Sequence, residues 1–182
     1  MPREETPRTE ELACTPITAD EVVDILLEHG WLAGQPSPEH LAWCERAAAI
    51  LGCQIADRKG LEDLLSLVFH YDSREILERV EAHAELSRVG ARDVVRQLAL
   101  LLLDGAPLTS ARFKEIVTAL KETLEIRSRD LFHPIRLALT GRAGEGDLDR
   151  VILLLDEAAA LPFAVPVKSA RERILEFCAA FD

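Results

Sequence analysis

Four arginines and one histidine gather in or just before one passage, LFHPIRLALTGRAGEGDL, which spans residues 131–148: Arg127, Arg129, His133, Arg136 and Arg142. A guanidinium presents a rigid, planar fork of N–H donors, which suits phosphate oxygens, base edges and carboxylates. Arg136 stands out because it lies inside an apolar run. We therefore expect Arg136 either to recognise a ligand or to pair with a carboxylate of the chain, such as Asp130.

His133 is a weak candidate for catalysis. No nucleophile or orienting carboxylate lies at a defined spacing from it, so a helix-capping or surface role is favoured over that of a general base. The sequence also contains no G-x-x-x-x-G-K-[ST], G-x-S-x-G or H-E-x-x-H motif. We predict no catalytic residues and no cofactor.

Three glycines, Gly141, Gly144 and Gly146, superficially suggest a phosphate-binding loop. They follow a predicted helix, whereas such loops follow a strand, and the carboxylates of Glu145 and Asp147 would repel a phosphate. A phosphate loop is therefore disfavoured.

The charge of the chain is unevenly distributed. The net charge is −11, which disfavours broad, non-specific attraction to a phosphate backbone. Residues 1–111 hold ten Lys and Arg against twenty Asp and Glu, while residues 112–182 hold eleven against twelve. Any anion-binding surface is expected in the C-terminal part.

The four cysteines form no C-x-x-C pair, and no signal peptide or run of eighteen apolar residues is present. Reduced thiols and a cytoplasmic location are expected, without membrane association. His40 and Cys44 have a spacing that suits metal ligands, but no second pair completes a site. We predict no metal site.

Helix caps and apolar periodicity predict an all-α protein. Cap signals stand at Thr18, Ser37, Asp72, Thr109 and Ser169, and apolar residues recur at helical spacing after each one. Eight or nine helices in two packed clusters are expected, over residues 18–30, 38–51, 61–71, 73–86, 91–105, 111–126, 134–141, 147–161 and 169–181. Pro134 is placed in the first turn of its helix.

The predicted organisation has three parts. Residues 1–16 mix prolines with charges and predict a disordered leader. Residues 17–106 are expected to form a first helical subdomain and residues 107–182 a second, with the two joined near 105–110.

The passage LFHPIRLALTG resembles the motif that opens the last domain of bacterial glutamyl-tRNA synthetases, in which Phe and Pro precede Arg, then Ala, Leu or Val, Thr and Gly. Upstream, LEDLLSLVFHY and ARFKEIVTALKETLEIRSRDLF are similar to two further helices of that family. The resemblance covers roughly residues 18–182 and implies two helical anticodon-binding domains. The HIGH-like and KMSKS-like motifs of the family's catalytic half are missing, so the chain looks like a stand-alone anticodon-binding module, unable to form an adenylate.

The resemblance also implies the residues that contact RNA. It places the family's base-reading arginine at Arg136. Arg127, Arg129 and Arg142 bracket the motif, and their clustering predicts contacts to phosphates. The other candidates are His133 and Thr140 in the motif, Leu148 in the following loop, and Arg58 and Lys59 in the turn before LEDLLSLVFHY. The family's loop usually reads Gly-Pro-x-Leu, whereas here Leu148 is retained, the proline is lost and Glu145 and Asp147 are gained.

These observations leave three hypotheses for function. The favoured one is a non-catalytic protein that binds tRNA of the glutamate type and acts in trans with a separately encoded catalytic subunit. The alternative is a helical protein-interaction module that kept the fold and lost RNA binding, which the net charge and the acidic loop favour. The third is one part of a longer synthetase, against which Met1 and the polar leader argue.

Overall fold

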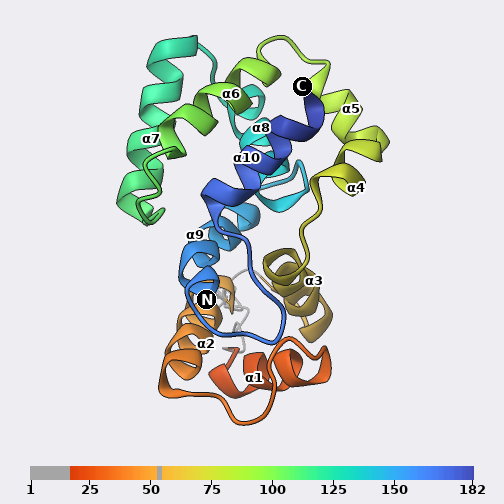
Figure 1. Ribbon diagram of the computed structural model, residues 1–182, viewed down its shortest axis with the longest axis vertical. Coiled ribbons are helices and arrows are strands. Elements are labelled where there is room, and N and C mark those ends of the chain that lie inside the picture. The colour runs from red at the N-terminus through yellow and green to blue at the C-terminus, as the bar shows by residue number, and fades with distance from the viewer. Residues whose placement is uncertain (1–16, 53–54) are drawn as a thin grey trace, which may run out of the picture.

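A computed structural model describes residues 17–52 and 55–182, so the leader predicted at 1–16 lies outside the described residues. Within these ranges the chain forms helices and no strands, which confirms the all-α prediction (Figure 1). The helices are α1 (Ala19–Glu28), α2 (Pro38–Leu51), α3 (Arg58–Phe69), α4 (Ser73–Glu78), α5 (Val80–Leu86), α6 (Ala91–Leu102), α7 (Ser110–Leu124), α8 (Arg129–Thr140), α9 (Asp147–Ala159) and α10 (Ala170–Phe181).

The predicted caps begin these helices. Thr18, Ser37 and Ser169 each form a reciprocal capping box, in which the cap side chain accepts from the backbone three residues later and that residue's side chain accepts from the cap backbone. Asp72 and Thr109 also accept from first-turn amides. Each cap satisfies backbone donors that have no partner within the helix.

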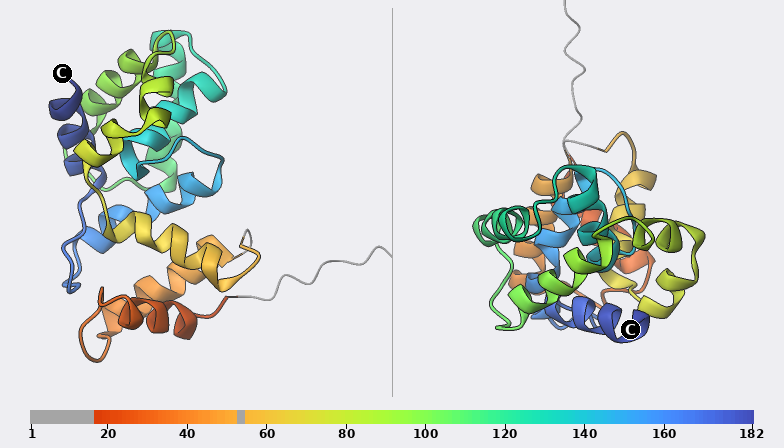
Figure 2. Two further views of the ribbon diagram at one scale, coloured as in Figure 1. Left: turned by 90° about the vertical axis from the view of Figure 1, so that its right-hand side faces the viewer. Right: turned by 90° about the horizontal axis from the view of Figure 1, so that it is seen from above.

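The buried apolar residues form two clusters, stacked along the long axis of the molecule (Figures 1 and 2). One cluster contains α1, α2 and α3, and the other contains α4 to α8 and α10. Helix α9 serves both, because Ile152 packs into the second cluster while Leu148, Val151 and Leu155 pack into the first. The late helix α9 therefore completes the core of the earliest helices, and a boundary near residue 106 stays a prediction.

The structure differs most from the prediction in two helices. The helix expected over 73–86 is broken at Arg79, whose backbone is extended, because α4 packs on α10 while α5 packs on α8. The helix that carries Pro134 begins at Arg129 and not at Pro134, so the proline lies inside it. A proline has no N–H, and its ring disfavours the normal bond to the carbonyl four residues earlier.

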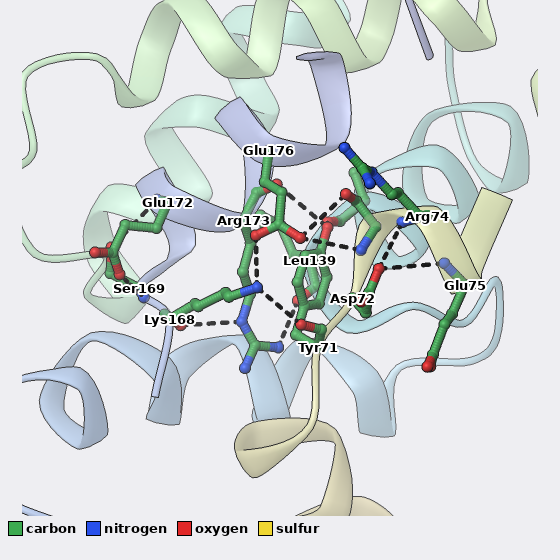
Figure 3. A network of polar contacts seen from close by, with 12 residues as sticks. Tyr71, Asp72, Arg74, Glu75, Leu139, Lys168, Ser169, Glu172, Arg173 and Glu176 are labelled. Carbon is green, nitrogen blue, oxygen red and sulfur yellow. Dashed lines mark hydrogen bonds and ion pairs between the residues drawn. The ribbon is translucent and has the colours of Figure 1, made fainter. Parts of the chain in front are cut away.

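A fully buried arginine joins the two clusters. Arg173 of α10 is 1% exposed, and its Cζ lies 4.7 Å from the Tyr71 ring centroid. Its guanidinium donates to the carbonyls of Leu67, Val68, Leu139 and Lys168. Figure 3 shows Arg173 beside Tyr71, Leu139 and Lys168. Burial lowers its pKa to about 10. These carbonyls belong to the ends of α3 and α8 and to the segment before α10. Arg173 therefore holds the C-terminal end of α8 beside the end of α3.

None of the helices formed by residues 17–52 and 55–182 combines the length and apolar character that crossing a membrane requires.

Candidate nucleic-acid interface

Helix α8 and the turns at its two ends contain most of the predicted site residues. Its twelve residues span roughly 18 Å at 1.5 Å per residue. Arg127, Arg129 and His133 lie at or before its N-terminal end, whereas Thr140 and Arg142 lie at its C-terminal end. The predicted residues therefore do not form one compact pocket.

Arg136 is held inside the protein by a two-pronged ion pair. Its Nε donates to Asp149 Oδ1 at 2.8 Å, and its Nη2 donates to Asp149 Oδ2 at 2.9 Å. A third donor, Nη1, bonds to the carbonyl of Gly144 at 2.7 Å, and the whole residue is only 8% exposed. The carboxylate partner is Asp149 and not Asp130, the partner named from the sequence, because Asp130 pairs with Arg88.

The ring of Phe132 lies beside the guanidinium of the buried Arg136. Arg136 Cζ is 5.0 Å from the ring centroid, and Nζ of Lys121, from α7, is 5.7 Å from it. Phe132 is partly exposed and lines a surface recess of about 560 Å³ with Lys121, Glu122, Glu125, Arg127 and Ser128. Lys121 and Phe132 were not among the site residues predicted from the sequence.

The turn that carries Arg127 has an uncommon backbone. Glu125 and Ser128 have φ angles of 56° and 54°, and among the described residues they are the non-glycine positions with positive φ. Residues other than glycine rarely adopt a positive φ, because their Cβ atom is crowded there. Such positions often occur at binding sites. Arg127 is exposed, and we find no ion pair or hydrogen bond for its side chain within the described part of the chain.

Arg129 and His133 share a buried carboxylate on α5. Glu85 is 5% exposed, and its Oε1 accepts from Arg129 Nη2 at 2.9 Å and lies 3.3 Å from His133 Nδ1. Arg129 Nε also lies 3.3 Å from the same ring nitrogen. Arg129 is still largely exposed, so it can contact a ligand, but part of its charge is balanced by Glu85.

The C-terminal end of α8 borders a second recess, of about 230 Å³. Its lining includes Thr140 and Arg142 together with His70, Asp72 and Arg79. The Thr140 hydroxyl is occupied within the helix, because it donates to the Arg136 carbonyl at 2.8 Å. Arg142 is exposed, and in the residues that the structure describes it forms no ion pair with a carboxylate, although Asp72 lines the same recess.

The remaining predicted residues lie elsewhere. Leu148 is 4% exposed and packs into the first cluster, so it is a core residue in this structure. Arg58 and Lys59 lie in the first turn of α3 and not in the turn before it, because Asp57 caps that helix. Arg58 pairs with Glu28 and Glu62, and Lys59 pairs with Asp63, which leaves both cations balanced by carboxylates.

Comparison with known families decides the classification. Residues 21–161 match the anticodon binding domain family, which is well over half of the chain. The chain belongs to this family. The predicted resemblance to the anticodon-binding region of the synthetases is therefore confirmed, while the division into two subdomains and the roles of individual residues in RNA contact stay predictions.

Several relatives of this anticodon-binding chain are glutamate–tRNA ligases. It is 26% identical to the enzyme of Bacillus subtilis (strain 168) over 146 residues, which are 78% of this chain and 30% of the enzyme. It is 26% identical to the enzyme of Latilactobacillus sakei over 121 residues, or 66% of the chain and 24% of that enzyme. A 77-residue stretch is 32% identical to glutamate–tRNA ligase 2 of Syntrophus aciditrophicus, covering 42% of the chain and 16% of the ligase.

The anticodon-binding chain thus spans less than a third of each of these ligases. No solved structure matches it.

Proposed function

We propose that the protein binds a tRNA of the glutamate type through the anticodon arm. The observation that carries this proposal is that residues 21–161 belong to the anticodon binding domain family. The glutamate–tRNA ligases among its relatives support the choice of tRNA. Phosphate contacts dominate affinity for nucleic acid, so exposed cations with no carboxylate partner are the first requirement.

The N-terminal end of α8 supports the proposal. Arg127 and Lys121 are exposed there, have no carboxylate partner in residues 17–52 and 55–182, and flank the partly exposed Phe132. Cations beside an aromatic ring suit a single-stranded loop, whose phosphates bind the cations and whose bases stack on the ring. Arg142 adds a cation at the other end of the helix.

The proposed role is binding without amino-acid activation. The chain corresponds to a fraction of the ligases, and the matching family is an anticodon-binding one. We place adenylate formation on a separate catalytic polypeptide that acts with this one in the cytoplasm. The purified protein should not exchange pyrophosphate into ATP with glutamate and tRNA, and exchange above a heat-inactivated control would refute this part.

A second candidate is a protein-interaction module, and the ion pairs of the predicted arginines favour it. Arg58, Arg129 and Arg136 each pair with a carboxylate, and the net charge of the chain is −11. Such pairing lowers the positive potential that would attract a phosphate backbone.

Titration of labelled glutamate tRNA at several salt concentrations separates the two candidates. RNA binding predicts saturable curves whose log affinity falls linearly with log salt, because phosphate contacts release counterions. Replacing Arg127 with Gln should flatten that slope, whereas Arg74→Gln, at an exposed arginine on α4, is the control. No binding at low salt would leave the interaction module as the function.

A further inference from the structure

The recess between α7 and α8 has the dimensions and the chemistry of a binding site for a small planar group. Its volume of about 560 Å³ falls within the range of roughly 300 to 1,000 Å³ found for ligand pockets. It is bounded by the last turns of α7, by the turn at 125–128 and by Phe132 of α8. The positive φ angles of Glu125 and Ser128 define the path of that turn.

The aromatic ring at this recess offers a stacking surface. Phe132 is partly exposed, although most large apolar side chains of α8 are buried. Bases stack on aromatic side chains with little regard to sequence, because every base has a π face. Lys121 Nζ lies 5.7 Å from the ring centroid. The lysine side chain is flexible, so the ammonium group can move to a phosphate when a base stacks on the ring.

The two exposed cations at the recess form no ion pair within the described residues. Lys121 and Arg127 have no carboxylate partner there, in contrast to Arg58, Lys59 and Arg129. Two cations beside a stacking surface match a nucleotide, whose phosphate and base lie a few ångströms apart. The phosphate of a bound nucleotide would therefore supply the anionic partner that neither cation has in the described residues.

Two carboxylates narrow the class of base. Glu122 and Glu125 also line the recess, are exposed, and have no ion-pair partner in the part of the chain that the structure describes. A carboxylate accepts from the exocyclic amine of cytosine, whereas the carbonyl oxygen that uracil carries at the same position would be repelled. The recess thus favours a base with an exocyclic amine over uracil.

Arg136 supports the stacking ring from inside. Its guanidinium is fixed by Asp149 and the Gly144 carbonyl and lies 5.0 Å from the Phe132 ring centroid. Three of its donors are therefore already engaged, and little of its surface is exposed. This geometry makes Arg136 a positioning residue for Phe132, in contrast to the base-reading role that the resemblance implies.

We infer that the recess formed by Lys121, Glu122, Glu125, Arg127 and Phe132 binds one unpaired RNA base with an exocyclic amine, stacked on Phe132 and held at its phosphate by the two cations. This inference rests on the proposed function, because it names where a loop base of the tRNA is bound. It adds to that function a position, a base class and a changed role for Arg136.

The first test compares two aromatic substitutions by titrating a fluorescent anticodon stem-loop RNA. Phe132→Leu should weaken binding about tenfold, and Phe132→Tyr should retain it, because tyrosine preserves the stacking face. The matched control is Phe181→Leu, since Phe181 also has two cations near its ring, Arg92 at 5.8 Å and Arg96 at 5.7 Å. Lys121→Gln should weaken binding more than Lys114→Gln on the same helix.

The outcomes of this test distinguish the recess from the function. If the unchanged protein binds the stem-loop and Phe132→Leu binds as well as Phe181→Leu, the recess is not the site, while tRNA binding stands. If the unchanged protein binds neither the stem-loop nor whole tRNA, the proposed function fails and the inference fails with it. Circular dichroism of each variant establishes that it is folded.

The second test concerns the base and Arg136. When the cytosines of the RNA loop are replaced with uracil one at a time, the replacement at one position should weaken binding. The Glu122→Gln, Glu125→Gln double variant should no longer prefer cytosine over uracil at that position. In a double-mutant cycle, Arg136→Ala should add little to the loss caused by Phe132→Leu, because it acts through that ring. Arg136→Lys should bind RNA more tightly than Arg136→Ala does. If Arg136→Ala weakens RNA binding as much in the Phe132→Leu variant as in the unchanged protein, Arg136 contacts RNA itself and the positioning role is overturned.

Discussion

Asp149 holds Arg136 through two hydrogen bonds of 2.8 and 2.9 Å, and this pair connects the start of α9 to the middle of α8. The Arg136 side chain is 10% exposed and that of Asp149 is 23% exposed. Together with the bond to Gly144, the pair fixes the loop between the two helices. The residue that sequence reasoning singled out for recognition is thus tied to the architecture of the loop that follows it.

Breaking this ion pair should destabilise the protein measurably. We expect Asp149→Ala to lower the free energy of unfolding by about 2 kcal/mol or more, because a partly buried guanidinium loses its partner. Urea unfolding followed by circular dichroism measures the change. Asp130→Ala, which breaks the exposed pair with Arg88, is the control and should change stability by under about 1 kcal/mol. Equal effects of the two substitutions would contradict the structural role of Asp149.

Replacing Arg173 should lower the free energy of unfolding more than Asp149→Ala does. Arg173→Met keeps most of the volume but leaves the carbonyls of Leu67, Val68 and Leu139 without their donor in a buried environment. Unsatisfied buried groups cost about 1 to 3 kcal/mol each, so a loss of about 3 kcal/mol or more is expected. Arg171→Met, at an exposed arginine two residues earlier, should be close to neutral in the same urea experiment. A stable Arg173→Met protein would mean that these bonds contribute little.

Alkaline pH should destabilise the fold through Cys44. Burial raises the pKa of its thiol from 9.0 to about 12, and burial also raises the pKa of Tyr71. Between pH 9 and 12 the unfolded chain loses the thiol proton while the folded protein keeps it, so stability falls as pH rises. Each such group contributes at most about 1.4 kcal/mol per pH unit.

Cys44→Ala tests that contribution. The variant should be less stable at neutral pH, because a buried side chain is shortened, but its stability should fall less steeply between pH 9 and 12. Urea midpoints measured at half-unit steps give the slope. An unchanged slope would show that Cys44 does not contribute to alkaline unfolding.

The sequence predicted the elements whose signals are local. Thr18, Ser37 and Ser169 marked helix starts correctly because a capping box involves residues only three apart. The start of α8 was wrong because Pro134 resembles a first-turn proline, whereas the helix already begins five residues earlier. The break at Arg79 depends on which helices α4 and α5 pack against, and that information is not local.

The candidate site was less predictable for the same reason. Arg136 and Asp149 are thirteen residues apart across a glycine loop, so the sequence did not reveal that they meet. Lys121 and Phe132 come from different helices, and their proximity depends on the turn at 125–128. A cation near the end of one helix and an aromatic residue at the start of the next were the available signals.

Neutralising the acidic loop should strengthen RNA binding if the loop faces RNA. Glu145 is exposed and Asp147 is partly exposed, and carboxylates near phosphates are repulsive. The Glu145→Gln, Asp147→Asn double variant should bind tRNA about two- to fivefold more tightly at low salt, with a smaller gain at high salt. Glu39→Gln and Asp24→Asn, in the first cluster, serve as the control pair. No gain would place the loop away from the RNA.

Competition between parts of a tRNA tests the central claim most directly. With the protein bound to labelled glutamate tRNA at low salt, an unlabelled anticodon stem-loop is added in one series and an acceptor-stem minihelix of equal length in another. Equal length keeps the non-specific phosphate term similar in both series. Binding through the anticodon arm predicts that the stem-loop displaces the tRNA at a concentration at least about ten times lower than the minihelix. Equal displacement by both RNAs, or by the minihelix alone, would contradict it.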